Sequence, residues 1–398
     1  MLGWELPPHN SGGLGVACYQ LCRALAKNGA DIEFILPYDA EHEVSFMKVT
    51  PAIPQGIEKL RAQMLGIYDS SDFGIKRSIM EGLSSEDQQE IYAKAVLEIV
   101  DAREFDIIHA HDWLTFRAGL RAREVTGLPL ILHVHSIETD RAGGEKGNPL
   151  VREIEATSLL LADGVIAVSQ FTKDAIVREY GIPADKIEVV HNSIDPDILS
   201  PLEPENAYAY LSQMRPKGYK VVTNVGRLTV QKGIPNLLMV AKEVIARAPK
   251  TLFLIVGSGE QYFELIDMAA ELGISKNVIF TGFLRGKKWR DSFSVSDLFV
   301  LPSVSEPFGI TPLEAIAYGC PVIITKQSGV AEILHNSLKV DFWDTNKMAD
   351  QILGVIQNDS LHDELQRNAY DELSRLNWEP AASNVLNMYE KHFSKAAA

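Results

Sequence analysis

The strongest constraint on the fold of this chain is an alternation of short apolar runs, rich in β-branched residues, with longer segments of helical periodicity. Runs that are apolar throughout fit strands buried on both faces of a parallel sheet, because helices cover both faces of such a sheet. A first series of runs lies at residues 32–36, 107–110, 130–134, 165–168 and 187–190. A second series lies at residues 221–225, 252–256, 278–280, 298–301 and 322–325. The two series predict an α/β protein with two doubly wound sheets.

The length of the chain agrees with two domains, because 398 residues exceed what one hydrophobic core usually supports. Residues 191–204 contain three prolines and few apolar residues, and we place the connection between the domains there. The expected domains are therefore residues 1–197 and 198–377. Residues 51–86 have mixed charge and weak periodicity, which predicts a variable surface excursion, with an acceptor-side insertion as the alternative.

Composition and charge exclude several classes of function. The net charge of −15 argues against general nucleic-acid binding and against electrostatic attachment to an anionic membrane. No apolar run reaches the roughly 18 residues of a membrane span, and no secretory leader precedes Trp4. We therefore expect a cytoplasmic protein without stable membrane insertion. The three cysteines, Cys18, Cys22 and Cys320, are too few for a disulfide framework and are expected to be reduced packing residues.

Residues 303–314, SVSEPFGITPLE, place two carboxylates around a turn that opens a helix. Glu306 precedes the turn and Glu314 lies in the first helical turns. A helix N-terminus attracts phosphate, and ionised glutamate accepts paired hydrogen bonds from vicinal hydroxyls. The amides expected to face the phosphate are those of Phe308, Gly309 and Ile310. The segment therefore indicates a site for a sugar nucleotide.

A second segment, residues 226–233, reads GRLTVQKG and connects a predicted strand to a predicted helix. The planar guanidinium of Arg227 can bridge phosphate oxygens, and Lys232 adds a mobile point charge. Together the two side chains can neutralise a leaving diphosphate without a metal ion. The alternative is a salt-bridged pair at the surface with no ligand.

The residues EPFG at Glu306 and LEA at Glu314 resemble those of the retaining glycosyltransferases of family 4, and GRLTVQKG is similar to the G-R-x5-K-G pattern of that family. The resemblance covers nearly the whole chain. It implies the GT-B architecture, two Rossmann-like domains facing across a cleft, with residues 378–398 returning to the first domain. It also implies that Arg227 and Lys232 stabilise the diphosphate, Glu306 holds sugar hydroxyls and Glu314 holds ribose hydroxyls.

The resemblance suggests further donor-binding residues in strand-to-helix turns. Gly12 and Gly13 form a glycine turn after a short first strand, where backbone amides can approach a pyrophosphate. The comparable loop of glycogen and starch synthases is K-x-G-G-L, and this chain has no lysine there. Gly257 ends another predicted strand and belongs by resemblance to the nucleotide pocket, with Leu284 expected near the base.

Two histidine-containing segments, residues 109–113 (HAHDW) and 133–135 (HVH), end predicted strands of the first domain. Alternating residues of a strand share one face, but a metal site also needs distant ligands, and the sequence identifies none. By resemblance, His135 orients the transferred hexose, with a structural histidine as the alternative. Asp112 and Trp113 resemble the acceptor-side HDW element of glycogen synthase-like enzymes, and a core position is the alternative for the tryptophan.

Residues 135–144, HSIETDRAGG, resemble the H-S/A-T-E-x-D-R-x-G-G loop of a bacterial and archaeal glycogen synthase-like branch. This resemblance places Glu138, Asp140 and Arg141 on the acceptor side. The D-x-D motif at residues 195–197 lies in the predicted connector and follows residues 192–194 (NSI), which resemble the structural N-G-V-D segment of the family. We therefore assign it no metal ligand.

Taken together, these features predict a retaining, metal-independent hexosyltransferase without a cofactor. The favoured donor is ADP-glucose or UDP-glucose, and the favoured acceptor is an α-glucan or a small glycoside, as in a glycogen synthase-like enzyme. The alternatives are a nucleotide-sugar epimerase or a pyridoxal-phosphate phosphorylase of the same fold, or a non-catalytic sugar-nucleotide-binding protein. A retaining glycosidase, whose carboxyls lie about 5 Å apart, is disfavoured because it does not need the cationic pair. No sequence feature indicates an oligomeric state.

Overall fold

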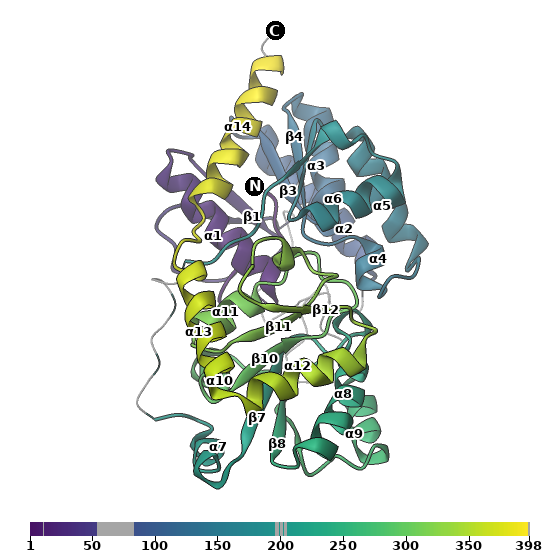
Figure 1. Ribbon diagram of the computed structural model, residues 1–398. Helices are drawn as coiled ribbons and strands as arrows, with labels where there is room; N and C mark the ends of the chain where they lie inside the picture. Colours follow the sequence, from purple (N-terminus) through teal and green to yellow (C-terminus); the bar gives the residue numbers. More distant parts are fainter. Residues whose placement is uncertain (11, 54–82, 196–198, 200–201, 203–204, 397–398) are drawn as a thin grey trace. The chain divides into compact units, whose positions relative to one another are not determined.

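A computed structural model describes residues 1–10, 12–53, 83–195, 199, 202 and 205–396 (Figure 1). The chain divides into two compact units. The first comprises Met1–Thr139, Lys146–Asn192 and Trp378–Ala398, and the second comprises Asp140–Glu145 and Ser193–Asn377. Most of the expected surface excursion at residues 51–86, and most of the D-x-D segment, lie outside the described residues.

All strands of the first unit pair in parallel. Its strands are β1 (Glu33–Leu36), β2 (Lys48–Pro51), β3 (Ile108–His111), β4 (Leu130–Val134), β5 (Gly164–Ala167) and β6 (Ile187–Val189). Strand β1 pairs with β2, and the other four strands follow the order β3-β4-β5-β6. Leu2 makes parallel bridges to both Ile35 in β1 and Ala110 in β3, and so takes the place of a first strand between them. The order along the chain therefore reverses between Leu2 and β3, where doubly wound folds bind ligands at the carboxyl ends of the strands.

Helices connect and cover the strands of the first unit. They are α1 (Gly13–Lys27), α2 (Ser85–Asp101), α3 (Trp113–Thr126), α5 (Pro149–Leu161), α6 (Gln170–Tyr180), the 3-10 turn η1 (Ala184–Lys186) and α14 (Glu379–Ala396). The short helix α4 (Glu138–Arg141) contains the point where the chain passes into the second unit. The last helix, α14, packs along α1, and Tyr389 from α14 hydrogen-bonds to His109 of β3 (Figure 1).

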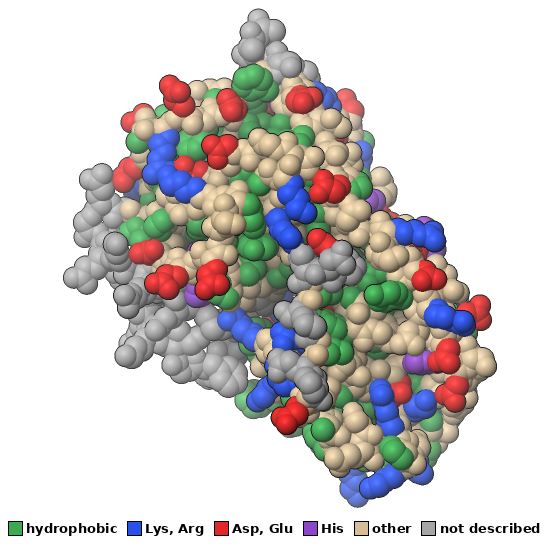
Figure 2. Space-filling model, turned by 90° about the vertical axis from the view of Figure 1, so that its left-hand side faces the viewer, with side chains coloured by type: hydrophobic (Ala, Val, Ile, Leu, Met, Phe, Trp, Pro, Cys, Tyr) green, Lys and Arg blue, Asp and Glu red, His purple; other side chains and the backbone are tan. Residues whose placement is uncertain are grey.

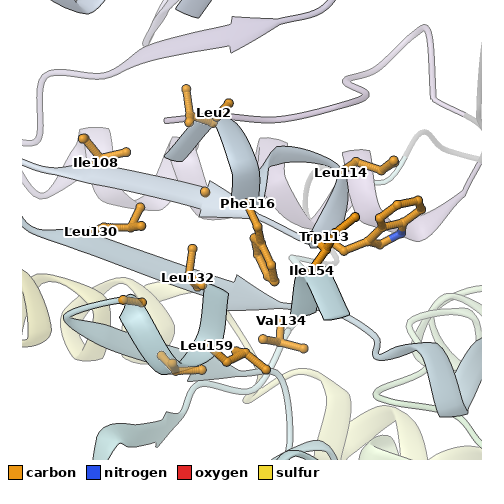
Figure 3. Packing of buried hydrophobic residues seen from close by; sticks show 14 of the residues in the cluster. Leu2, Ile108, Trp113, Leu114, Phe116, Leu130, Leu132, Val134, Ile154 and Leu159 are labelled. Atoms are coloured by element: carbon orange, nitrogen blue, oxygen red, sulfur yellow. The ribbon is translucent and has the colours of Figure 1, made fainter. Parts of the chain in front are cut away.

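The core of the first unit forms where α3 and α5 pack against the sheet. Leu130, Leu132 and Val134 of β4 face the same cluster, so the strand contributes a row of apolar side chains (Figure 3). The helix residues drawn with them are Trp113, Leu114, Phe116, Ile154 and Leu159. Burying each large apolar side chain stabilises the fold by about 1.5–3 kcal/mol. This cluster holds the ends of β3 and β4, from which the polar residues of this unit project.

The second unit contains a six-stranded parallel sheet in the order β12-β11-β10-β7-β8-β9. Its strands are β7 (Lys220–Val225), β8 (Thr251–Val256), β9 (Val278–Phe280), β10 (Leu298–Leu301), β11 (Val322–Thr325) and β12 (Leu338–Val340). Read from β9, the strands run 3-2-1-4-5-6 in chain order, which is the dinucleotide-binding arrangement. The order reverses between β7 and β10. A ligand site is therefore expected in the loops that follow these two strands.

Helices flank this sheet as well. They are α7 (Ala209–Ser212), α8 (Ile234–Arg247), α9 (Tyr262–Glu271), α10 (Gly286–Ser294), α11 (Thr311–Ala317), α12 (Thr345–Gln357) and α13 (Asp359–Leu373), with 3-10 turns η3 (Arg215–Lys217), η4 (Val230–Lys232) and η5 (Gly329–Glu332). Helices α8 and α12 pack together, and their apolar faces join Val222, Phe253 and Ile323 of the sheet in one core.

The prediction of two doubly wound parallel sheets is confirmed. Each of the ten predicted strands is present, with ends that differ from the prediction by no more than one residue. Strands β2 and β12 were not predicted. Both pair with one neighbouring strand and contain partly exposed residues, so neither has a continuous apolar run.

Candidate active site

The loops that follow β7 and β10 pack against each other at the reversal point of the second sheet. The amide of Val304 donates to the carbonyl of Gln231 at 2.9 Å. Gly233 has a φ of +66°, and a Cβ at this position would lie 2.2 Å from the carbonyl oxygen of Pro302. Glycine is therefore required here for the two loops to approach so closely. This contact brings together the two sequence segments that were predicted to bind the donor.

Lys232 and Glu306 meet where these loops touch. The Nζ of Lys232 lies 2.6 Å from Oε2 of Glu306, and the hydroxyl of Ser303 donates to the same oxygen at 2.9 Å. Glu306 is buried, and Lys232 retains 18% of its side-chain exposure. Ser303 lies inside the segment singled out from the sequence, but its contact with Glu306 was not predicted. The sequence signal that could have indicated this contact is a small hydroxyl residue two positions after a buried strand.

The backbone of Glu306 is fixed by the residues that follow β11. The amide of Glu306 donates to Gln327 at 2.9 Å, and the amide of Gly329 donates to the carbonyl of Glu306 at 2.9 Å. These two bonds form a parallel bridge that extends the sheet beyond β10. The carboxylate is therefore held from its backbone as well as by Lys232 and Ser303.

The turn after Glu306 matches its expected shape. Gly309 has a φ of +96°, which favours glycine, and its Cα faces the side chain of Glu306. The carbonyl of Phe308 accepts from Val330 at 2.7 Å. Among the described residues, the amides of Gly309 and Ile310 have no hydrogen-bond partner. Two of the three predicted amide donors are thus available at the start of α11.

Glu314 lies in the first turn of α11. Its side chain is half-buried, and poor solvation raises the pKa of this carboxyl to about 8. A carboxyl with that pKa is mostly neutral at pH 7. It can then donate one hydrogen bond as well as accept them.

The loop after β8 approaches the loop after β7 through two glycines. A Cβ at Gly257 would lie 1.8 Å from the carbonyl oxygen of Gly226, and a Cβ at Gly259 would lie 2.4 Å from that of Leu228. The amide of Gly257 also donates to Gly282 at 3.0 Å, next to the segment that contains Leu284. Gly257 therefore lies beside the loop of Arg227, which is half-buried. The roles of Gly257, Leu284 and Arg227 toward a nucleotide remain predictions.

In the first unit, Asp112 shapes the loop that follows β4. Its Oδ1 accepts from the amides of His135 at 2.6 Å and Ser136 at 3.2 Å. The aspartate is buried and adopts a φ of 59°, which is uncommon outside glycine. Asp112 is thus a positioning residue for the backbone of His135. This contact gives it a structural reason to be present, beside the predicted acceptor-side role.

Trp113, predicted on the acceptor side, belongs to the core. Only 5% of its surface is exposed, and it packs with Leu114 and Phe116 of the same helix (Figure 3). Its ring therefore does not offer a face on which a sugar could stack. The sequence motif His-Asp-Trp alone does not distinguish an exposed, acceptor-side tryptophan from one buried in the core.

The glycine turn at the start of α1 contains a protein carboxylate. Oε1 of the buried Glu5 accepts from the amide of Gly15 at 3.1 Å. A carboxylate at a helix N-terminus satisfies the amides and the helix dipole that a phosphate would otherwise use. The carboxylate of Glu5 thus reduces the attraction of this glycine turn for a phosphate. Binding of the nucleotide sugar by Gly12 and Gly13 stays a prediction.

The predicted acceptor-side residues of α4 have different environments. Glu138 accepts from the amide of Asn148 at 2.8 Å, within the first unit. Asp140 belongs to the second unit and accepts from the hydroxyl of Ser305 at 2.6 Å. Asp140 and Ser305 are both buried, and Ser305 precedes Glu306. Arg141 is half-buried.

Four histidines of β3, β4 and the loop after β4 form a stack of imidazole rings. The ring centroids of His109 and His111 lie 4.4 Å apart, as do those of His133 and His135. Burial lowers the pKa of each, to about 3 for His135, so all four are neutral at pH 7. Nitrogens of three of these rings approach within 4.8 Å of one another. A second group of possible ligand atoms within that distance comes from Cys18, His111 and His135. The facing ring nitrogens pair with each other, His109 with His133 at 3.2 Å and His111 with His135 at 3.1 Å, and we assign no metal ligand here.

Acidic and basic side chains of the described residues lie intermixed on the face seen in Figure 2. This distribution agrees with the net charge of −15. Among the described residues, no helix combines the length and apolar character needed to cross a bilayer.

Comparisons with known proteins identify the family. The model of Glycosyltransferase Family 4 matches residues 11–198, and the model of Glycosyl transferases group 1 matches residues 212–372. The chain is 29% identical over 401 residues to an uncharacterized glycosyltransferase of Methanocaldococcus jannaschii, and the alignment covers 98% of this chain and 97% of the relative. It is 26% identical over 399 residues to the glycogen synthase of Mycobacterium tuberculosis, covering 98% of this chain and 93% of that one.

A solved structure shows the same fold. The sucrose-phosphate synthase of Thermosynechococcus elongatus superposes with a TM-score of 0.78 at 20% identity, covering 99% of this chain and 98% of that one. The two parallel-sheet α/β domains are therefore those of the GT-B fold, as predicted. The two family models match successive parts of the chain. The chain belongs to the GT-B glycosyltransferases of group 1, family 4.

Proposed function

We propose that this glycosyltransferase is a retaining, metal-independent hexosyltransferase that takes glucose from ADP-glucose or UDP-glucose. The observation that carries the proposal is the meeting of Lys232 and Glu306 at the reversal point of the second sheet. A cation and a carboxylate within one hydrogen bond of each other suit a ligand in which a diphosphate adjoins a sugar.

Each charged group has a defined task in this proposal. Arg227 and Lys232 stabilise the diphosphate, and the amides of Gly309 and Ile310 add donors near it. Glu306 accepts hydrogen bonds from hexose hydroxyls and Glu314 binds the ribose hydroxyls. His135 orients the hexose. The close approach of Gly257 to Gly226 supports this proposal, because it holds the loop after β8 against the loop of Arg227.

Catalysis is then mainly electrostatic. The bond between C1 of the hexose and the diphosphate oxygen breaks, and its electron pair goes to the diphosphate. The acceptor hydroxyl oxygen bonds to C1 from the same face, and its proton passes to the departing diphosphate. Fixed positive charge at the diphosphate lowers the energy of this step, because negative charge grows there in the transition state.

The favoured acceptor is an α-glucan or a small glycoside. Similarity over nearly the whole chain to a glycogen synthase supports this choice. The half-buried Arg141 and the loop of Glu138 are the proposed acceptor-side groups. The buried position of Trp113 removes one aromatic platform from this proposal.

Other functions of the same fold predict different experimental observations. An epimerase would convert the donor without releasing nucleoside diphosphate in proportion to an acceptor. A pyridoxal-phosphate phosphorylase would show an absorbance band from its cofactor. A non-catalytic binding protein would bind the donor tightly without turnover on any acceptor.

The decisive experiment is a donor screen that measures nucleoside diphosphate release, crossed with a panel of glycans, small glycosides and lipid acceptors. Release that depends on both donor and acceptor supports the proposal. Lys232→Ala should abolish most of the release, whereas Lys242→Ala, on the exposed face of the helix that follows the same loop, is the matched control. Donor binding by the wild type without acceptor-dependent release of nucleoside diphosphate would overturn the proposed function.

A further inference from the structure

The four stacked histidines consist of two hydrogen-bonded pairs. His109 Nε2 lies 3.2 Å from His133 Nδ1, and His111 Nδ1 lies 3.1 Å from His135 Nε2. In each pair one ring comes from β3 or its end and the other from β4 or the loop after it. A neutral imidazole has one N–H and one lone pair, so each pair shares a single proton between the facing nitrogens.

The position of that proton in the pair of His111 and His135 follows from the other nitrogen of His111. His111 Nε2 is buried without a hydrogen-bond partner among the described residues. If His135 donated to His111, the proton of His111 would sit on Nε2 as a buried, unpartnered N–H. Buried N–H groups without an acceptor are rarer than unpartnered acceptors. The favoured arrangement therefore has His111 Nδ1–H donating to His135 Nε2.

This arrangement determines what His135 presents to its surroundings. With Nε2 accepting from His111, the proton of His135 resides on Nδ1. His135 is half-buried, and Nδ1 has no protein partner among the described residues. Its backbone is fixed by Asp112, and its ring is fixed by His111. The side chain is thus a neutral hydrogen-bond donor with a set direction.

We infer that His111 is a positioning residue that holds His135 as the Nδ1–H tautomer, so that His135 donates a hydrogen bond to a hydroxyl oxygen of the transferred hexose. The inference rests on the proposed function for the identity of the ligand. The tautomer itself does not depend on that function, because it follows from the contact between the two rings and from the buried, unpartnered Nε2 of His111.

The test compares three variants. His111→Leu removes the donor to His135. His111→Asn retains it, because the asparagine amide nitrogen occupies nearly the position of histidine Nδ1. His109→Leu is the matched control, because His109 is equally buried but hydrogen-bonds to His133 and Tyr389 and does not contact His135.

The first readout is the ¹⁵N NMR spectrum of histidine-labelled protein, in which protonated and unprotonated ring nitrogens have distinct shifts. His135→Asn assigns the His135 signals among the ten histidines. We expect Nδ1–H in the wild type, in His111→Asn and in His109→Leu, and a shift toward Nε2–H in His111→Leu. A wild-type proton on Nε2, or an unchanged spectrum in His111→Leu, would overturn the inference.

The second readout is transfer from the nucleotide sugar. Loss of one oriented hydrogen bond corresponds to about a tenfold fall in kcat. His111→Leu should show that fall with little change in KM, and His111→Asn should recover most of it. An equal fall in His109→Leu would indicate general destabilisation and contradict the inference. If no donor is turned over by the wild type, the proposed function fails, and the NMR readout still decides the tautomer.

Discussion

The Nζ of Lys232 lies 2.6 Å from the Oε2 of Glu306, and the two residues come from loops that follow the two central strands of the second sheet. Ser303 donates to the same carboxylate oxygen at 2.9 Å. The cation assigned to the diphosphate and the anion assigned to the hexose are therefore direct partners. We expect a bound donor to place its diphosphate beside Lys232 and its sugar beside Glu306. The same ion pair would then contribute both to donor binding and to the stability of the site.

A double-mutant cycle on Lys232→Met and Glu306→Gln tests the strength of this ion pair. Removing one partner of a buried pair typically lowers the free energy of unfolding by about 3–5 kcal/mol, because the other charge is left buried. We expect each single variant to approach that loss, and the double variant to lose less than the sum. Urea denaturation measures all four proteins.

The matched control is the ion pair of Arg247 and Asp350, which has the same 2.6 Å separation but side chains that are 49% and 63% exposed. A cycle on that pair should give no more than about 1 kcal/mol of coupling. Equal coupling in the two cycles would show that burial of Lys232 and Glu306 does not strengthen their interaction.

Glu306→Gln and Glu314→Gln should differ in their kinetic effects. Glu306 is assigned to the transferred sugar, so its change should lower kcat while nucleoside diphosphate binding is largely retained. Glu314 is assigned to the ribose, so its change should weaken binding of donor and of nucleoside diphosphate alike. Calorimetric titration with UDP and ADP separates the two. Weaker nucleotide binding in Glu306→Gln alone would reverse the two assignments.

Nucleotide binding should release protons through Glu314. The pKa of this carboxyl is raised to about 8 in the protein alone, so the group is mostly protonated at pH 7. Ribose hydroxyls that donate to the carboxylate stabilise its charged form and lower the pKa. Calorimetry in buffers with different ionisation enthalpies should detect release of up to about one proton per nucleotide at pH 7. Glu314→Gln should remove this release, and a release that persists in the variant would exclude Glu314 as its source.

The histidine stack should make the first unit sensitive to acid. The pKa values of His109, His111, His133 and His135 are lowered by burial, whereas an unfolded histidine titrates near 6.5. Between pH 6.5 and the lower folded values, the unfolded chain binds more protons than the folded chain. Stability is therefore complete above pH 6.5 and falls as the pH decreases, by at most about 1.4 kcal/mol per pH unit for each histidine.

Hydrogen exchange of peptides from the first unit, measured between pH 5 and 7.5, reports this loss after correction for the intrinsic exchange rate. The slope of the opening free energy against pH is proportional to the number of protons taken up on unfolding. His109→Leu should reduce this slope by the amount that corresponds to about one proton. A slope that is the same in the variant and the wild type would show that His109 does not titrate on unfolding.

The interior strands were predictable because their signal is local. Strand β4 at Leu130–Val134 is apolar throughout and buried on both faces, and this pattern suffices to locate it. Strand β2 contains the exposed Lys48 and Pro51, and β12 has only three residues, so neither carries the pattern of a buried strand. Edge strands need less burial, and their sequences are correspondingly less distinctive.

The site was predictable at the level of loops but not of contacts. Sequence motifs identified the segments after β7 and β10, and the strand order then brings them together. The pairing of Lys232 with Glu306 spans 74 residues and depends on the close approach at Gly233, which spacing along the chain does not encode. Trp113 shows the same limit, because the buried face of α3, and not the HDW spelling, decides its environment.

The most direct test of the account is the anomeric configuration of the product formed from an α-linked donor in excess chelator. Arg227, Lys232 and the amides of Gly309 and Ile310 supply positive potential at the diphosphate, so transfer should proceed at an unchanged rate without free divalent metal. NMR of the new anomeric proton should show the α-configuration. A β-linked product would contradict retention, and activity that is lost in chelator and restored by Mn²⁺ would contradict stabilisation of the leaving group by protein charges alone.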